Sequence, residues 1–134
     1  MASLKDQFLS GSVPQNLDLM GEWAVHLVAE YLPPIRFFMH KKVVQRETGG
    51  GLAGHNQFLG AIKAGHFKVD RGPSSGNPEL EVVRISYDIP KNPGLFRPLT
   101  DEVRMIADDK YLGQGMYKFP SGPRNVFWFT MTRL

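Results

Sequence analysis

The hydrophobic positions of the chain change their period near residue 21. Before this point, the stretch SLKDQFLSG (residues 3–11) places Leu4, Phe8 and Leu9 on one helical face, with Ser3 as the N-cap. From residue 21 onward, apolar and polar residues alternate, which is typical of strands with one buried face. The pattern predicts a short N-terminal helix followed by an otherwise all-β chain.

Alternation and turn signals divide the rest of the chain into eight expected strands. Their residues are 22–31, 35–47, 55–63, 66–72, 80–89, 101–107, 111–119 and 125–133. Short links favour antiparallel pairing of neighbours, and closure of the sheet would remove its edges. We therefore expect residues 1–134 to form one domain, an all-β, eight-stranded antiparallel up-and-down barrel.

The alternation also assigns a face to each strand residue. The residues assigned to the interior include Trp23, Val25 and Leu27 in the first strand, Met39 and Val43 in the second, and Val83, Ile85 and Tyr87 in the fifth. Lys42 falls on the opposite, polar face. The third and fourth strands are expected to meet at a hinge at Ala64-Gly65.

The motif Gly21-x-Trp23 opens the first strand after an irregular lead-in, and this arrangement resembles the lipocalin or calycin group. The tail also resembles small bacterial calycin-like proteins with no assigned reaction. The resemblance implies that Trp23 packs across a closed barrel end and that Arg133 lies over its indole as a cation–π partner. Gly21 would let the incoming segment cross closely. We expect the helix near Trp23 or across an opening.

The interior face is rich in phenylalanine and methionine, which suits a pocket for an apolar or amphipathic small molecule. Tyrosine and asparagine side chains would orient the polar part of such a ligand. The predicted ligand-binding residues are Tyr87, Tyr117, Asn56, Met39, Phe58, Met105 and Phe129. The leading hypothesis is therefore ligand binding inside the barrel.

Two other functions stay open. An enzyme on the same scaffold, such as an isomerase, cyclase or hydrolase, would use Tyr87, Tyr117 or His55 as its acid or base. Further candidates for acid or base chemistry are Asp88, Asp101, Glu102 and Arg104, although charged strand faces usually face solvent. A filled barrel would instead suit an interaction module, with a homodimer formed through residues 125–133, where Trp128 points outward.

Composition narrows the partners. The chain has 16 lysines and arginines, 13 acidic residues and a net charge of +3, and the basic residues are scattered, so no nucleic-acid footprint is expected. The four histidines lack metal-motif spacing, and no metal or other cofactor is expected. The glycine-rich stretch at 49–54 lacks the lysine of a phosphate loop and is expected at the barrel mouth.

The cellular compartment follows from similar reasoning. The chain contains no cysteine, so no disulfide framework is expected. No apolar run reaches the roughly 20 residues of a membrane helix, and the N-terminus does not read as a secretory signal. We expect no membrane span and a cytoplasmic location.

Overall fold

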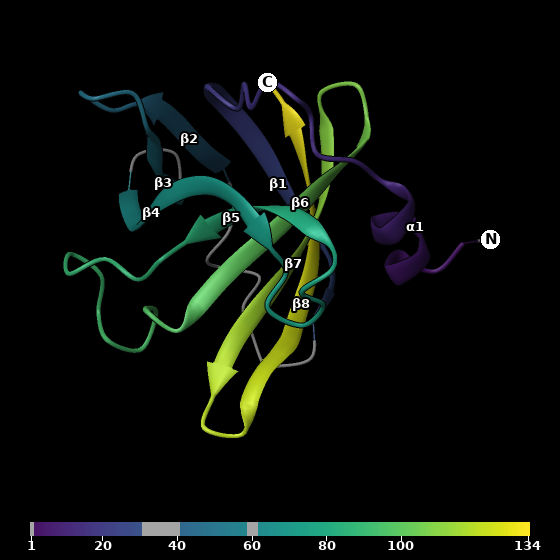
Figure 1. The fold of residues 1–134 in the computed structure, drawn as a ribbon. Coiled ribbons are helices and arrows are strands. Elements are labelled where there is room, and N and C mark those ends of the chain that lie inside the picture. The colour runs from purple at the N-terminus through teal and green to yellow at the C-terminus, as the bar shows by residue number, and fades with distance from the viewer. Residues whose placement is uncertain (1, 31–40, 59–61) are drawn as a thin grey trace.

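The computed structural model describes residues 2–30, 41–58 and 62–134, and these form a closed antiparallel barrel with one short N-terminal helix (Figure 1). The expected up-and-down meander is confirmed, with each strand beside its sequence neighbours and β1 paired to β8. The elements are α1 (Leu4–Ser10), β1 (Gly21–Glu30), β2 (Lys41–Arg46), β3 (Leu52–Phe58), β4 (Ile62–Pro73), β5 (Glu81–Ser86), β6 (Leu99–Ala107), β7 (Lys110–Phe119) and β8 (Gly122–Arg133).

The meander gives the barrel two different ends. One end, here the tryptophan end, carries the start of β1, the β2–β3 turn and the C-terminus, at the top of Figure 1. The other, here the loop end, carries the β5–β6 loop (87–98) and the β7–β8 turn. The glycine-rich stretch at 49–54, expected at the barrel mouth, belongs to the β2–β3 turn at the tryptophan end and thus lies opposite the β5–β6 loop.

The tryptophan end has the geometry that the family resemblance implies for three residues. Trp23 is fully buried, and its Nε1 donates to the carbonyl of Leu19 at 2.9 Å. The Arg133 guanidinium carbon lies 4.3 Å from the Trp23 ring centroid. Gly21 has a φ of +116°, a conformation that favours glycine, and the Arg133 guanidinium lies beside it.

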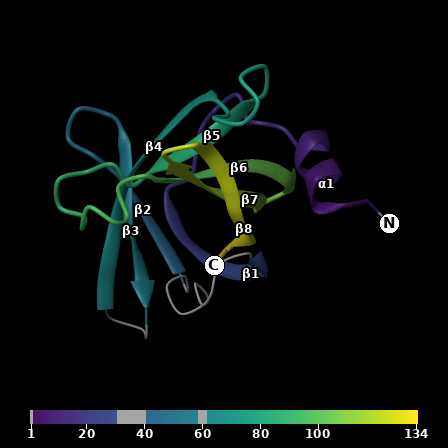
Figure 2. The same cartoon turned by 90° about the horizontal axis from the view of Figure 1, so that it is seen from below.

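Helix α1 forms as predicted but packs elsewhere. Ser3 Oγ accepts from the Asp6 amide at 3.0 Å, which confirms the N-cap. The helix lies outside the barrel wall (Figure 2), where the Phe8 ring meets Trp128 edge-on at 5.5 Å. The expectation of a helix near Trp23 or across an opening is therefore wrong. Because Phe8 covers Trp128, the outward tryptophan leaves only 7% of its surface exposed.

The predicted assignment of residues to the inner and outer faces is correct for β1 and β5, but the two faces are exchanged in β2. Lys42 and Val44 point inward and are buried, whereas Val43 is only partly buried, so the predicted phase is off by one residue. The predicted hinge at Ala64-Gly65 is also wrong. The described part of β3 ends at Phe58 and β4 runs from Ile62, and Gly65, with a φ of +60°, lies within β4.

Aromatic rings packed on glycines fill much of the described interior. A Cβ on Gly113 would lie 2.3 Å from the Phe129 ring, and one on Gly115 would lie 2.2 Å from the Phe127 ring. Phe67 covers Gly54 in the same way, at 2.8 Å. The glycines leave room for these rings to pack over the neighbouring strand. In the described ranges, no helix has the length and apolarity needed to cross a membrane.

Candidate functional site

Four buried polar side chains meet inside the barrel, in its half nearer the loop end. Lys42 comes from β2, Asn56 from β3 and Asp101 from β6, while Tyr87 directly follows β5. Lys42 and Asp101 are fully buried, and Tyr87 and Asn56 are 2% and 5% exposed. We call these residues the polar quartet.

Lys42 is at the centre of the quartet. Its Nζ donates to Tyr87 Oη at 2.6 Å and to Asn56 Oδ1 at 2.8 Å, and it lies 3.0 Å from Asp101 Oδ2. These contacts match the three hydrogens of an ammonium group. The rings of Phe67, Tyr87 and Phe129 surround the cation, with centroids at 5.2, 5.3 and 5.6 Å. Such contacts stabilise a cation that has lost its water.

The Tyr87 hydroxyl joins the other members. It donates to Asp101 Oδ2 at 2.8 Å and accepts from Lys42 Nζ and from Asn56 Nδ2, the latter at 3.0 Å. Asn56 Nδ2 also reaches the Gly65 carbonyl at 3.5 Å. A Cβ at Gly65 would lie 2.8 Å from that nitrogen, so the bend in β4 needs glycine to keep Asn56 in place.

The β5–β6 loop is anchored beside Tyr87. The buried side chain of Asn92 donates to the carbonyls of Tyr87 and His66, at 2.8 and 2.6 Å, and accepts from the His66 amide at 2.9 Å. One asparagine thus ties the loop to β4 and to the end of β5. This clamp holds the backbone that positions the Tyr87 ring.

Burial shifts the protonation of the quartet in two directions. Loss of water lowers the pKa of Lys42 below its ordinary 10.5, while the negative charge of Asp101 and its hydrogen bond act in the opposite sense. Burial, followed by the Asp101 charge, raises the pKa of Tyr87 well above its ordinary 10.0. Tyr87 therefore keeps its proton at neutral pH and donates it to Asp101.

The raised pKa of Tyr87 predicts a loss of stability in alkali. Above pH 10.0 the unfolded tyrosine ionises while the buried one does not, so the free energy of unfolding falls as pH rises. Only well above its ordinary pKa of 10.5 is Lys42 neutral in both states, so that it adds no slope there. Urea unfolding in that range should show wild type losing up to about 1.4 kcal/mol per pH unit more than Tyr87→Phe. Equal slopes of the free energy of unfolding against pH in the two proteins would contradict the raised pKa of Tyr87.

The structure brings together three of the residues predicted to bind a ligand, namely Tyr87, Asn56 and Phe129. Tyr117 does not join them, because its hydroxyl donates outward to the Leu95 carbonyl at 2.8 Å. The Tyr117 hydroxyl is therefore not placed for either of its predicted roles, which were a polar contact to an interior ligand and the acid or base of an enzyme.

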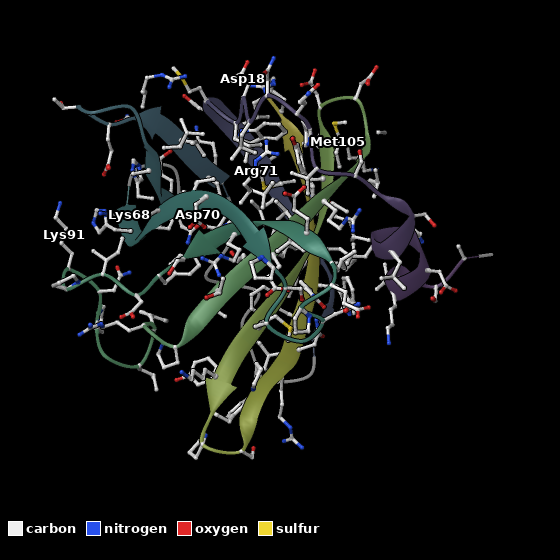
Figure 3. The ribbon with its side chains drawn as sticks, viewed as in Figure 1. Asp18, Lys68, Asp70, Arg71, Lys91 and Met105 are labelled. Carbon is white, nitrogen blue, oxygen red and sulfur yellow. The ribbon has the colours of Figure 1, made fainter. Side chains whose placement is uncertain are left out.

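The remaining predicted residues do not contribute to the quartet. Met105 lies towards the tryptophan end, where its backbone pairs with Ser12, and Figure 3 places it in the upper part of the molecule with Asp18. Met105 packs against the core there and lies apart from Tyr87 and Asn56. Met39 and the side chain of Phe58 lie outside the described residues.

Lys42 points into the barrel, so its assignment to the polar face is wrong. Asp101, one of the acid or base candidates, is also fully buried, although charged strand faces usually face solvent. A signal for them does exist in the sequence. Lys41-Lys42 and Asp101-Glu102 are pairs of like charges within strands, and neighbouring strand residues point to opposite faces. One member of each pair must therefore point into the barrel.

Glu102 is buried on the outer side of the wall, which also corrects its predicted solvent exposure. Its carboxylate accepts from Ser74 Oγ at 2.7 Å, from Ser75 Oγ at 2.9 Å and N at 2.8 Å, and from Gln114 Nε2 at 3.0 Å. These bonds fasten the β4–β5 loop over β6 and β7. The Glu102 carboxylate therefore holds the loop in place, and it lies on the opposite side of the barrel wall from the quartet.

Two other groups of polar side chains lie outside the quartet. His55 and His66 face each other across β3 and β4, with ring centroids 6.2 Å apart, but the described residues contain no group of three or more side chains suited to a metal ion.

An outer groove of about 870 Å³ lies at the loop end between the β5–β6 loop and β7, and includes the Asp88–Arg97 ion pair and Lys118. The groove contains no quartet residue.

Comparison with protein-family models, curated proteins and solved structures gives no match for this chain. The geometry of the site therefore carries the functional argument.

Proposed function

We propose that the protein is a calycin-like binding protein that holds a small amphipathic molecule inside its barrel, with the polar end of the ligand at the quartet. The observation that carries the proposal is the buried quartet itself, which lies among aromatic rings. Burying a lysine and an aspartate is costly even when they are paired. A polar contact for a ligand gives this costly arrangement a use.

The difference between the two barrel ends supports entry at the loop end. The tryptophan end is closed by the fully buried Leu19 and Trp23. Towards the loop end, Leu27, Leu99 and Tyr117 point to the core but are only partly buried. These apolar surfaces suit the hydrophobic body of a ligand. Leu99 lies two residues before Asp101 on the same strand face, between the quartet and the loop end.

Hydrogen bonding within the quartet favours binding over catalysis. A general base must be able to take up a proton near neutral pH. Tyr87 keeps its own proton there, and its hydroxyl is already engaged by three neighbours. The interaction-module alternative loses its best surface, because Phe8 of the same chain covers Trp128. Ligand binding is thus the function best supported by these contacts.

Titration with the neutral dye Nile red tests the proposal. We expect saturable binding, accompanied by the blue shift and intensity rise of the dye in an apolar site. Leu99→Trp should abolish it by filling the approach to the quartet, whereas Leu9→Trp, at a helix position that is 43% exposed, should leave it unchanged. Absence of saturable binding to the wild type would refute the proposed function.

A matched pair of hydroxyl deletions tests the role of the quartet. Tyr87→Phe should weaken Nile red binding, because loss of the hydroxyl shared by Lys42 and Asn56 loosens the polar end of the pocket. The expected size is about 0.5–1.5 kcal/mol, the net value of one hydrogen bond within the quartet. Tyr117→Phe should not, since that hydroxyl bonds to the loop at Leu95. Equal effects of the two changes would remove the quartet from the proposal and leave only the pocket.

A further inference from the structure

We infer that the interior site selects a ligand whose polar end donates a hydrogen bond, such as an alcohol, over a carboxylate or an ether. The inference rests on the proposed function and adds the chemical class of the ligand. It follows from the hydrogen bonds of the quartet, in which every donor already has a partner and one acceptor oxygen does not.

All the donors of the quartet are in use. The Lys42 ammonium contacts Tyr87, Asn56 and Asp101. The Tyr87 hydroxyl donates to Asp101, and the Asn56 amide nitrogen donates to Tyr87 and to the Gly65 carbonyl. A ligand that only accepts hydrogen bonds would therefore have to break one of these bonds.

One acceptor of the quartet is open. Asp101 Oδ2 accepts from Tyr87 and faces Lys42, but Asp101 Oδ1 is buried without a hydrogen-bond partner in the described part of the chain. Leaving a buried carboxylate oxygen unpaired costs more than leaving a neutral acceptor unpaired. A ligand hydroxyl or N–H group placed at Oδ1 removes this cost.

The charge of the site argues against an anionic ligand. The buried charged side chains in the described ranges are Lys42, Asp101 and Glu102, and Glu102 lies on the outer side of the wall. The interior thus holds one cation and one anion, already paired at 3.0 Å. A ligand carboxylate would find no unpaired cation there and would be repelled by Asp101.

The neighbours of Asp101 leave the loop end as the side of approach. Asp101 lies opposite Ile85 on β5 and opposite Gly115 on β7, where the Phe127 ring takes the place of a side chain. Towards the loop end, the next residue on its own face is the partly buried Leu99. A donor at the head of an apolar chain would reach Oδ1 with its body along Leu99.

Displacement of Nile red by three ligands of matched length tests the inference. Octan-1-ol should displace the dye at a concentration at least about tenfold lower than 1-methoxyheptane or octanoate, as one hydrogen bond to a charged acceptor implies. Equal potency of the alcohol and the ether, as expected if only water occupies Oδ1, would overturn the inference and leave the proposed function. Tighter binding of octanoate would also overturn it. Failure of Nile red to bind would refute both.

The variant Asp101→Asn tests the atom itself. Its amide oxygen can keep the contacts to Tyr87 and Lys42, which places the NH₂ group where Oδ1 lies. The preference for alcohol over ether should then fall to about one. Asp88→Asn removes an exposed carboxylate at the outer groove and should keep the wild-type ratio. An Asp101→Asn ratio equal to wild type would refute the assignment. If Asp101→Asn does not fold, the same alcohol-to-ether ratio is measured in the double variant Lys42→Gln/Asp101→Asn, where it should also fall to about one. The wild-type displacement series then still tests the preference for a donor.

Discussion

Replacing Lys42 by methionine is expected to destabilise the protein by about 3–5 kcal/mol, because it leaves the buried Asp101 carboxylate without its cation. Methionine has a similar length, so little volume is lost and the effect is mainly electrostatic. Urea unfolding followed by circular dichroism measures the change. Combining Lys42→Met with Asp101→Leu removes both charges and should recover most of the loss, since apolar pairs often replace buried ion pairs without cost.

The adjacent lysine provides the control. Lys41 pairs with Glu22 at the surface, where the two side chains are 25% and 53% exposed. Exposed ion pairs contribute about 0–1 kcal/mol to the free energy of unfolding, so Lys41→Met should change that free energy by no more than the upper value. If Lys42→Met costs no more than Lys41→Met, the quartet is not the buried, paired arrangement described above.

Replacing Trp23 by alanine should cost about 3–5 kcal/mol, as truncation of large buried aromatic side chains does. The change removes the ring that packs edge-on against Tyr111 at 5.5 Å and beneath Arg133. It also leaves the Leu19 carbonyl without its indole donor. Thermal and urea unfolding measure the loss.

Trp23→Phe is the matched variant, since it keeps an aromatic ring but loses the N–H group. It should cost less than Trp23→Ala, and the difference reports the packing of the larger ring. A cost below about 1 kcal/mol for Trp23→Ala would mean that Trp23 does not hold the tryptophan end together. Dye binding at the loop end should survive in both variants wherever they stay folded.

Local pattern determined much of the fold. Alternation in β1 and β5 placed Trp23, Val25, Val83, Ile85 and Tyr87 inside, and short links implied a meander that closes on itself. These features depend on neighbours a few residues apart, which is why the sequence is sufficient for them.

Tertiary structure alone decided how the charged residues are used. A lysine on β2 can be buried only because β3, the end of β5 and β6 bring Asn56, Tyr87 and Asp101 within hydrogen-bonding distance of it. The position of α1 was decided in the same way, by the meeting of Phe8 and Trp128 across 120 positions of sequence. By itself the sequence determined the barrel, since alternation and turns are local, and the resemblance carried by Gly21-x-Trp23 implied the packing at the tryptophan end. The polar quartet needed the closed barrel, because only closure joins four distant residues and makes the burial of their charges tolerable.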